Sequence, residues 1–178
     1  MKLRSLLFAA LAISCFAFSI CAQKAASVKF TSVYTSLATT CRSYDGSNGS
    51  DGYSICKGPS RYQVRIYYSA TTTQFAAERK GKDDNFPIAT AGIGFNWNKT
   101  KLEWRLANGK PFAVIIRIPK YAEPAGDGDY GFSKVIGSEL VVAGLFGFED
   151  LKTSIDAKTP KANDLAREAA DAEYLSKR

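Results

Sequence analysis

Residues 102–117, LEWRLANGKPFAVIIR, decide the kind of fold that this chain can adopt. In the first half Leu102, Trp104 and Leu106 alternate with charged residues, a pattern typical of a strand with one buried face. After an Asn-Gly turn signal, residues 112–116 are apolar on both faces, as in a strand that is covered on both sides of its sheet. The stretch therefore predicts an antiparallel hairpin inside a packed sheet.

The register of this hairpin depends on the turn. A two-residue turn pairs residue 106 with 111 and places Trp104 on the opposite face from Phe112. A three-residue loop with Gly109 in the left-handed conformation pairs 106 with 110, so that Trp104 and Phe112 share one apolar face. Because a slip of one residue turns every side chain over, we expect the second register.

The C-terminal segment changes from strand to helix periodicity. Thr159 can cap a helix over about residues 160–176, and Pro160 suits its first turn. The small or apolar residues of this helix recur at helical spacing. They are Ala162, Leu165, Ala166, Ala169 and Ala172. We expect this stripe to pack on the outer face of the sheet and to cover Ile115 and Ile136.

Other segments also have strand character. Residues 62–68, YQVRIYY, alternate with period two, whereas residues 140–143, LVVA, are apolar on both faces. Together these patterns predict the α+β class, with a mainly antiparallel sheet, strongly curved or sandwich-like, and one C-terminal helix packed on it.

The N-terminus has the features of a cleavable signal peptide over residues 1–22. Lys2 and Arg4 precede an apolar run that is too short to span a membrane, and Ala22 offers a small residue for cleavage. Residues 23–178 then form one globular domain that is periplasmic or secreted, without a transmembrane segment. A lipid-anchored form at Cys15 or Cys21 is the less favoured alternative, since Ile20 before Cys21 is unsuitable for lipid attachment.

Removal of the signal peptide leaves two cysteines, Cys41 and Cys56. In an oxidising compartment an even pair is most simply a disulfide, and the turn-forming residues 45–52 between them suit a hairpin. The alternative, a redox pair, lacks the Cys-x-x-Cys spacing. We expect a structural Cys41–Cys56 disulfide.

Several stretches resemble a group of uncharacterised exported bacterial proteins. They are residues 34–37 (YTSL), 58–65 (GPSRYQVR), 102–117 and 156–171 (DAKTPKANDLAREAAD). The resemblance covers most of the mature chain in order. It implies export but transfers no activity.

The chain contains no histidine, which excludes serine and cysteine catalysis with a histidine base as well as histidine-ligated zinc. Glycoside hydrolysis would need two acids across a cleft. The candidate acids are Glu103, Asp127, Asp129, Glu139 and Glu149. We expect ordinary solvated acids or cross-strand ion pairs, with Glu103 as a partner for surface arginines such as Arg105 beside it on the same strand. We assign no catalytic residue and no cofactor.

Two further patterns resemble binding sites. Asp127-Gly-Asp129 resembles the start of a calcium loop but lacks the glycine and the acid that such a loop needs further on, as do residues 45–51, so no metal site is expected. Ile93, Phe95, Trp97 and Trp104 could form an aromatic binding platform, although the same spacing is typical of a core strand, which we favour.

Arg65, Arg105 and Arg117 share the strand parity opposite to the apolar face. If their strands are neighbours, these arginines form a cationic stripe that can bind carboxylates or sulfates. The mature net charge of +5, which is the +7 of the whole chain less Lys2 and Arg4, favours an anionic envelope component or an acidic protein over nucleic acid. The expected function is a non-catalytic binding module of the periplasm or cell envelope. The alternatives are a carboxylate-based hydrolase of envelope glycans and a purely structural envelope protein.

Overall fold

The structure is a computed structural model that describes residues 27–45, 52–69, 71–92, 95–122 and 134–178. The expected signal peptide, with Cys15 and Cys21, lies outside the described residues. So do Ile93, Asp127, Asp129 and most of the turn between the two cysteines.

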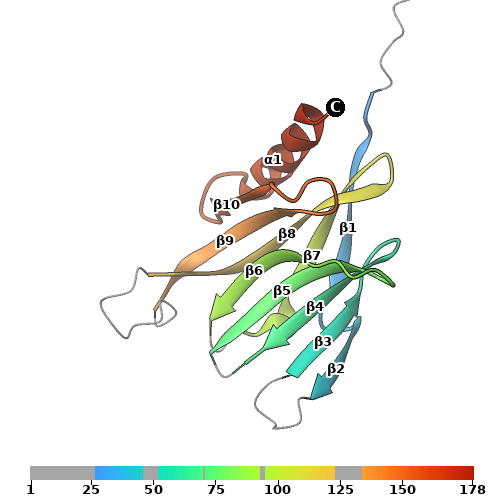
Figure 1. The fold of residues 1–178 in the computed structure, drawn as a ribbon. Helices are drawn as coiled ribbons and strands as arrows, with labels where there is room; N and C mark the ends of the chain where they lie inside the picture. Colours follow the sequence, from blue (N-terminus) through green and yellow to red (C-terminus); the bar gives the residue numbers. More distant parts are fainter. Residues whose placement is uncertain (1–26, 46–51, 70, 93–94, 123–133) are drawn as a thin grey trace, which may run out of the picture.

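The described strands form two antiparallel sheets of five strands each (Figure 1). The meander sheet contains β2 (Cys41–Asp45), β3 (Gly52–Lys57), β4 (Tyr62–Tyr68), β5 (Thr72–Arg79) and β6 (Phe86–Gly92), in this spatial order. The second sheet has the order β1 (Phe30–Ser36), β7 (Lys101–Ala107), β8 (Lys110–Tyr121), β9 (Val135–Gly144) and β10 (Lys152–Asp156). A short 3-10 helix, η1 (Trp97–Lys99), precedes β7, and α1 (Ala162–Ser176) ends the chain.

The main core lies between the two sheets. Along β4 the side chains of Val64 and Ile66 point inward and are fully buried, as the alternation of YQVRIYY predicts. They meet Trp104 and Val114 from the second sheet. Burial of these apolar side chains is the main force that holds the sheets face to face.

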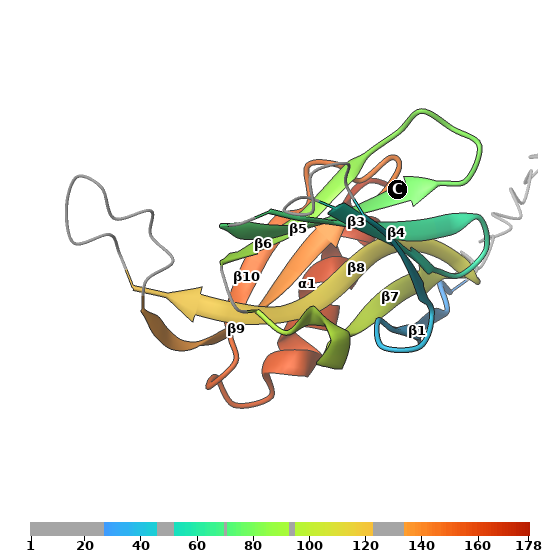
Figure 2. The same cartoon turned by 90° about the horizontal axis from the view of Figure 1, so that it is seen from below.

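A second core lies between the outer face of the β1–β10 sheet and α1, so we call this sheet the helix-bearing sheet (Figures 1 and 2). Ile115 and Val142 point to this side and are buried against the helix alanines. The central strands β8 and β9 are therefore covered on both faces, which is the reason that residues 112–116 and 140–143 are apolar throughout. The expected α+β class, with antiparallel sheets and one packed helix, is confirmed.

The stripe of α1 differs in part from the expected one. Ala162, Ala166 and Ala170 are buried, whereas Leu165 retains 38% of its exposure. The residue before the helix is Lys161, in a left-handed conformation with φ 59°, so Thr159 does not serve as the cap. The buried line runs through residues 162, 166 and 170, whose small side chains allow close approach to the sheet. Ile136 is not covered and stays 46% exposed.

The expected register of the β7–β8 hairpin is wrong. Ala107 pairs with Lys110 around a two-residue turn, in which Asn108 and Gly109 have φ values of 50° and 79°. A β-bulge follows, because the register shifts between Arg105 and Leu106. The extra residue restores the parity of the strand beyond the turn, so Trp104 faces Val114 in the main core. Phe112 does not share this face as expected, because it lies at the bulge and packs on the side of α1.

The Cys41–Cys56 disulfide is confirmed, and the two residues are directly opposite each other on β2 and β3. Among the described residues, no helix combines the length and the apolar character that crossing a bilayer requires.

Candidate binding site

The three arginines of the expected cationic stripe do not lie on one face. Arg65 projects from β4 on the outer face of the meander sheet, whereas Arg105 and Arg117 project from β7 and β8 of the helix-bearing sheet, on the side of α1. Equal parity along the sequence therefore does not bring Arg65 to the other two arginines, because β4 belongs to a different sheet from β7 and β8.

Arg65 and Arg105 each already have an acid partner. Arg65 donates from Nε and Nη2 to Glu78, at 2.5 and 3.0 Å, and its guanidinium lies 4.8 Å from the ring centre of Tyr53. Arg105 donates to both carboxylate oxygens of Asp171 in α1, at 2.7 and 2.5 Å. Paired in this bidentate way, neither guanidinium is free to bind an external anion.

Arg117 is exposed, and its hydrogen bonds to described residues are long, at 3.4 Å to Ser138 and 3.5 Å to Asn163. It lines a shallow cavity together with Lys99 and Lys101. Of the three predicted arginines it is the one whose charge faces solvent.

The candidate carboxylates are dispersed in the described part of the chain. Glu139 lines a groove beside β10, and Glu149 accepts a hydrogen bond from the Gly147 amide in the loop before β10. Glu103 lies under α1, where it accepts a hydrogen bond from Ser32 and two from Arg167, so the expected Glu103–Arg105 pair is not formed. No two of these three described acids face each other across a cleft.

The environment of Glu103 favours its ionised form. Burial alone would raise its pKa, but the hydrogen bonds from Arg167 and Ser32 outweigh burial and lower the pKa below the ordinary value for glutamate. A general acid needs a raised pKa, so Glu103 stabilises the docking of α1 and is unsuited to donate a proton.

The described members of the possible aromatic platform belong to the core. Trp104 is fully buried and its indole Nε1 donates to Thr35 Oγ1 at 2.9 Å, while Phe95 and Trp97 pack against the main core.

A different group of cations does come together, at one end of the outer face of the meander sheet. Arg42, Lys57, Arg61 and Lys80 line a pocket of about 560 Å³, which we call the basic pocket. All four are exposed, and among the described residues none of them forms a salt bridge. Among the residues that the structure describes, no acid lines the pocket.

The local fold holds these cations in place. Arg42 and Lys57 directly follow the two cysteines, so the disulfide fixes the separation of their backbones. Arg61 lies in the turn between β3 and β4, whose ends are joined by the bond from the Gly58 amide to the Tyr62 carbonyl, at 3.1 Å. The Lys80 amide donates to the Arg61 carbonyl at 2.7 Å.

The floor of the basic pocket is anchored in the main core. Thr35 Oγ1, which accepts the Trp104 indole proton, itself donates to the Lys57 carbonyl at 3.2 Å. Gly58 packs so closely on Trp104 that a Cβ atom there would lie 2.6 Å from the indole ring. The end of β3 is therefore held rigidly against the helix-bearing sheet.

The sequence contains a signal for this pocket that was missed. Arg42 and Lys57 each follow a cysteine of the expected disulfide, which places both on the outward face of neighbouring strands. The positions of Arg61 and Lys80 could not be combined with them before the order of the strands was known.

Searches among protein-family models, curated proteins and solved structures found no match to this chain.

Proposed function

We propose that this protein is an exported, non-catalytic binding module whose basic pocket holds an anionic group of an envelope component. The observation that carries the proposal is the convergence of four exposed cations, Arg42, Lys57, Arg61 and Lys80, with no acid among the described lining residues. The resemblance to exported proteins and the disulfide support action outside the cytoplasm.

The physical basis is electrostatic. Four like charges around one pocket repel each other, and a bound anion relieves this repulsion while the guanidinium groups of Arg42 and Arg61 can donate paired hydrogen bonds to phosphate, sulfate or carboxylate. Both arginines and both lysines are exposed, so the attraction is screened by salt over about 8 Å at physiological ionic strength.

The test is calorimetric titration of the mature chain with dextran sulfate, with uncharged dextran as the ligand control. We expect binding of dextran sulfate that weakens as NaCl rises. Replacing the four pocket cations together (R42S, K57S, R61S, K80S) should lower the affinity at least tenfold.

A control variant with the same net charge distinguishes binding in the basic pocket from a general effect of net charge. It carries four exposed lysines from elsewhere replaced by serine: K29S, K110S, K134S and K158S. This control should lose far less affinity. An equal loss in the two variants, or no binding of dextran sulfate at low salt, would contradict the proposal.

A further inference from the structure

The last strand of the meander sheet has an open edge. In the described part of the chain β6 pairs with β5 alone, and no strand lies along its other side. Such an edge presents backbone N–H and C=O groups that can pair with another extended chain.

The direction of these groups can be deduced at the end of β6. The Gly92 amide donates to Tyr121 Oη at 2.8 Å, and the Gly92 carbonyl accepts from the Phe95 amide at 3.4 Å, so both groups of Gly92 point away from β5. Backbone groups two residues apart along a strand point to the same side. The N–H and C=O of Thr90 therefore also point to the open edge, where no described residue bonds them.

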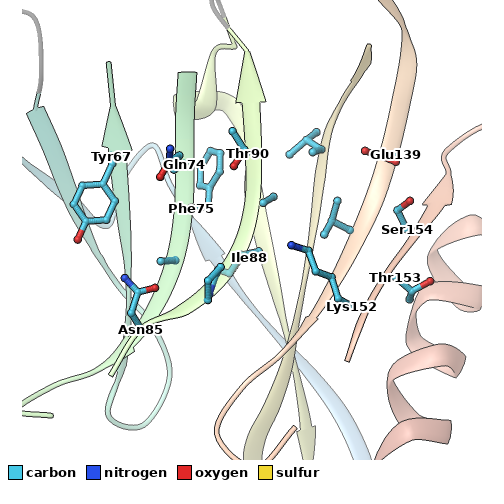
Figure 3. A pocket seen from close by; sticks show the side chains of 15 residues that line it. Tyr67, Gln74, Phe75, Asn85, Ile88, Thr90, Glu139, Lys152, Thr153 and Ser154 are labelled. Carbon is cyan, nitrogen blue, oxygen red and sulfur yellow. The ribbon is translucent and has the colours of Figure 1, made fainter. Parts of the chain in front are cut away.

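A groove of about 820 Å³ runs along this edge (Figure 3). Ile88 and Thr90 of β6 form one wall, and Glu139, Lys152 and Ser154 of the helix-bearing sheet form the other. The groove exists because β6 packs across β8 and β9, so the meander sheet ends before it covers the inner face of β10. A strand added to β6 would lie over β9 and β10.

We propose that the groove binds an extended peptide segment of a partner protein, which adds to the meander sheet as a strand beside β6. The backbone of the peptide would pair with Thr90, and its side chains would alternate between solvent and the inner face of the helix-bearing sheet. Pro87 has no amide proton, so pairing begins after it. This site is separate from the basic pocket and does not depend on the proposed function.

The charges of the groove define the chemistry of the peptide. Glu139 and Lys152 both line it, and neither has an ion-pair partner among the described residues. Lys152 pairs with Ala143, four residues from Glu139 along β9, so the two charges lie well apart. A complementary peptide carries an acidic residue over Lys152, a basic residue over Glu139 and small apolar residues toward Val141 between them.

A second copy of this chain does not fit the same edge. Two copies paired through β6 would each bring β9 and β10, which extend past β6, into the space that these strands occupy in the other copy. A single extended segment avoids this overlap.

The test uses a displayed library of random short peptides, selected against the mature chain. The tightest peptides are resynthesised and their dissociation constants are measured by fluorescence anisotropy. Thr90→Pro removes the amide that points to the groove and should weaken binding at least tenfold. Thr90→Val keeps that amide and the branched shape, and should bind like the unchanged protein.

Two further measurements keep the test decisive if Thr90→Pro fails to fold. The same peptide with alternate backbone amides N-methylated should lose at least tenfold in affinity, because it cannot donate to β6. Lys152→Glu should weaken the acidic peptides, and exchanging their acidic residue for lysine should restore binding. If the N-methylated peptides bind as tightly as the parents, or if no selected peptide distinguishes Thr90→Pro from Thr90→Val, the proposal is wrong.

Discussion

Glu103 has a different role in the structure from the one that its neighbours in the sequence suggest. Beside Arg105 in LEWRL it suggests an ion pair with a surface arginine or a catalytic acid. In the folded protein both residues turn to α1 instead, Glu103 to Arg167 and Arg105 to Asp171. These two ion pairs, with Ser32 between them, fasten the helix to the sheet.

The ion pair of Glu103 should make the stability of the protein depend on pH. Its folded-state pKa is lowered, so its contribution is present above the unfolded value of about 4.3 and is lost as the pH falls through the folded value. At neutral pH, Glu103→Gln should lower the free energy of unfolding by about 1–3 kcal/mol. Thermal unfolding between pH 7 and strongly acidic pH should show the difference between variant and parent shrinking below about pH 4. A difference that stays constant would contradict the ion-pair explanation.

Gly58 offers a second test at the scale of one residue. A Cβ atom at this position would lie 2.6 Å from the Trp104 ring and 3.0 Å from the Tyr62 carbonyl oxygen, and neither is free to move. We expect Gly58→Ala to destabilise the protein by about 1–3 kcal/mol in chemical denaturation, as overpacking does. Gly137→Ala is the matched control, because its Cβ would meet only the tip of Lys158 at 3.9 Å. Equal effects would show that the close approach is unimportant.

At the scale of elements, α1 shows that helical spacing in the sequence does not decide which of two neighbouring rows of small residues packs on the sheet. Both the expected stripe and the observed one contain Ala162 and Ala166, but the observed line continues through Ala170. The ion pairs of Arg167 and Asp171 with the sheet are consistent with this orientation of the helix.

Substitutions on the helix test this orientation. Ala166 is fully buried against the sheet, so Ala166→Leu should destabilise the fold by about 1–3 kcal/mol through overpacking. Ala172→Leu, on the exposed side, should leave the melting temperature nearly unchanged. Leu165→Asp should also have a small effect, in contrast to the expectation from the stripe. A large loss of stability for Leu165→Asp, with none for Ala166→Leu, would mean that the helix packs on the sheet through the side that carries Leu165.

At the scale of the whole molecule, the disulfide connects stability with the proposed binding site. Closing the loop between Cys41 and Cys56 stabilises the protein by about 3 kcal/mol in the chain-entropy model. Reduction, or the double change C41S and C56S, should therefore lower the melting temperature. It should also weaken dextran sulfate binding at temperatures where the protein stays folded, since Arg42 and Lys57 follow the cysteines. Unchanged affinity would show that the disulfide does not position the pocket.

Export is tested on the protein isolated from its own cells. If the signal peptide is cleaved after Ala22, the mature chain begins at Gln23. Its intact mass should then be lower by two hydrogens than the mass of the same chain with two free thiols. A mass that includes residues 1–22, or two alkylatable thiols in protein from the envelope fraction, would contradict export through the signal peptide.

Local patterns sufficed for much of the fold. Alternation in residues 62–68, two-sided apolar runs in 112–116 and 140–143, and small residues at helical spacing predicted strands, central strands and the C-terminal helix, because each pattern repeats within a few residues. The cysteine count predicted the disulfide, because only one pair remains if residues 1–22 are removed as the expected signal peptide.

The tertiary structure alone decided which side chains meet. Arg65 and Arg105 have the same parity, yet they lie in different sheets, and the bulge at Arg105 and Leu106 corrected a register that the turn alone would have reversed. The basic pocket joins residues from β2, β3, a turn and the end of β5, and the groove joins β6 to β10. These contacts depend on the order of strands that are distant in the sequence and on how far one sheet extends past the other. Both follow from the packing of the whole core, which no short stretch of sequence encodes.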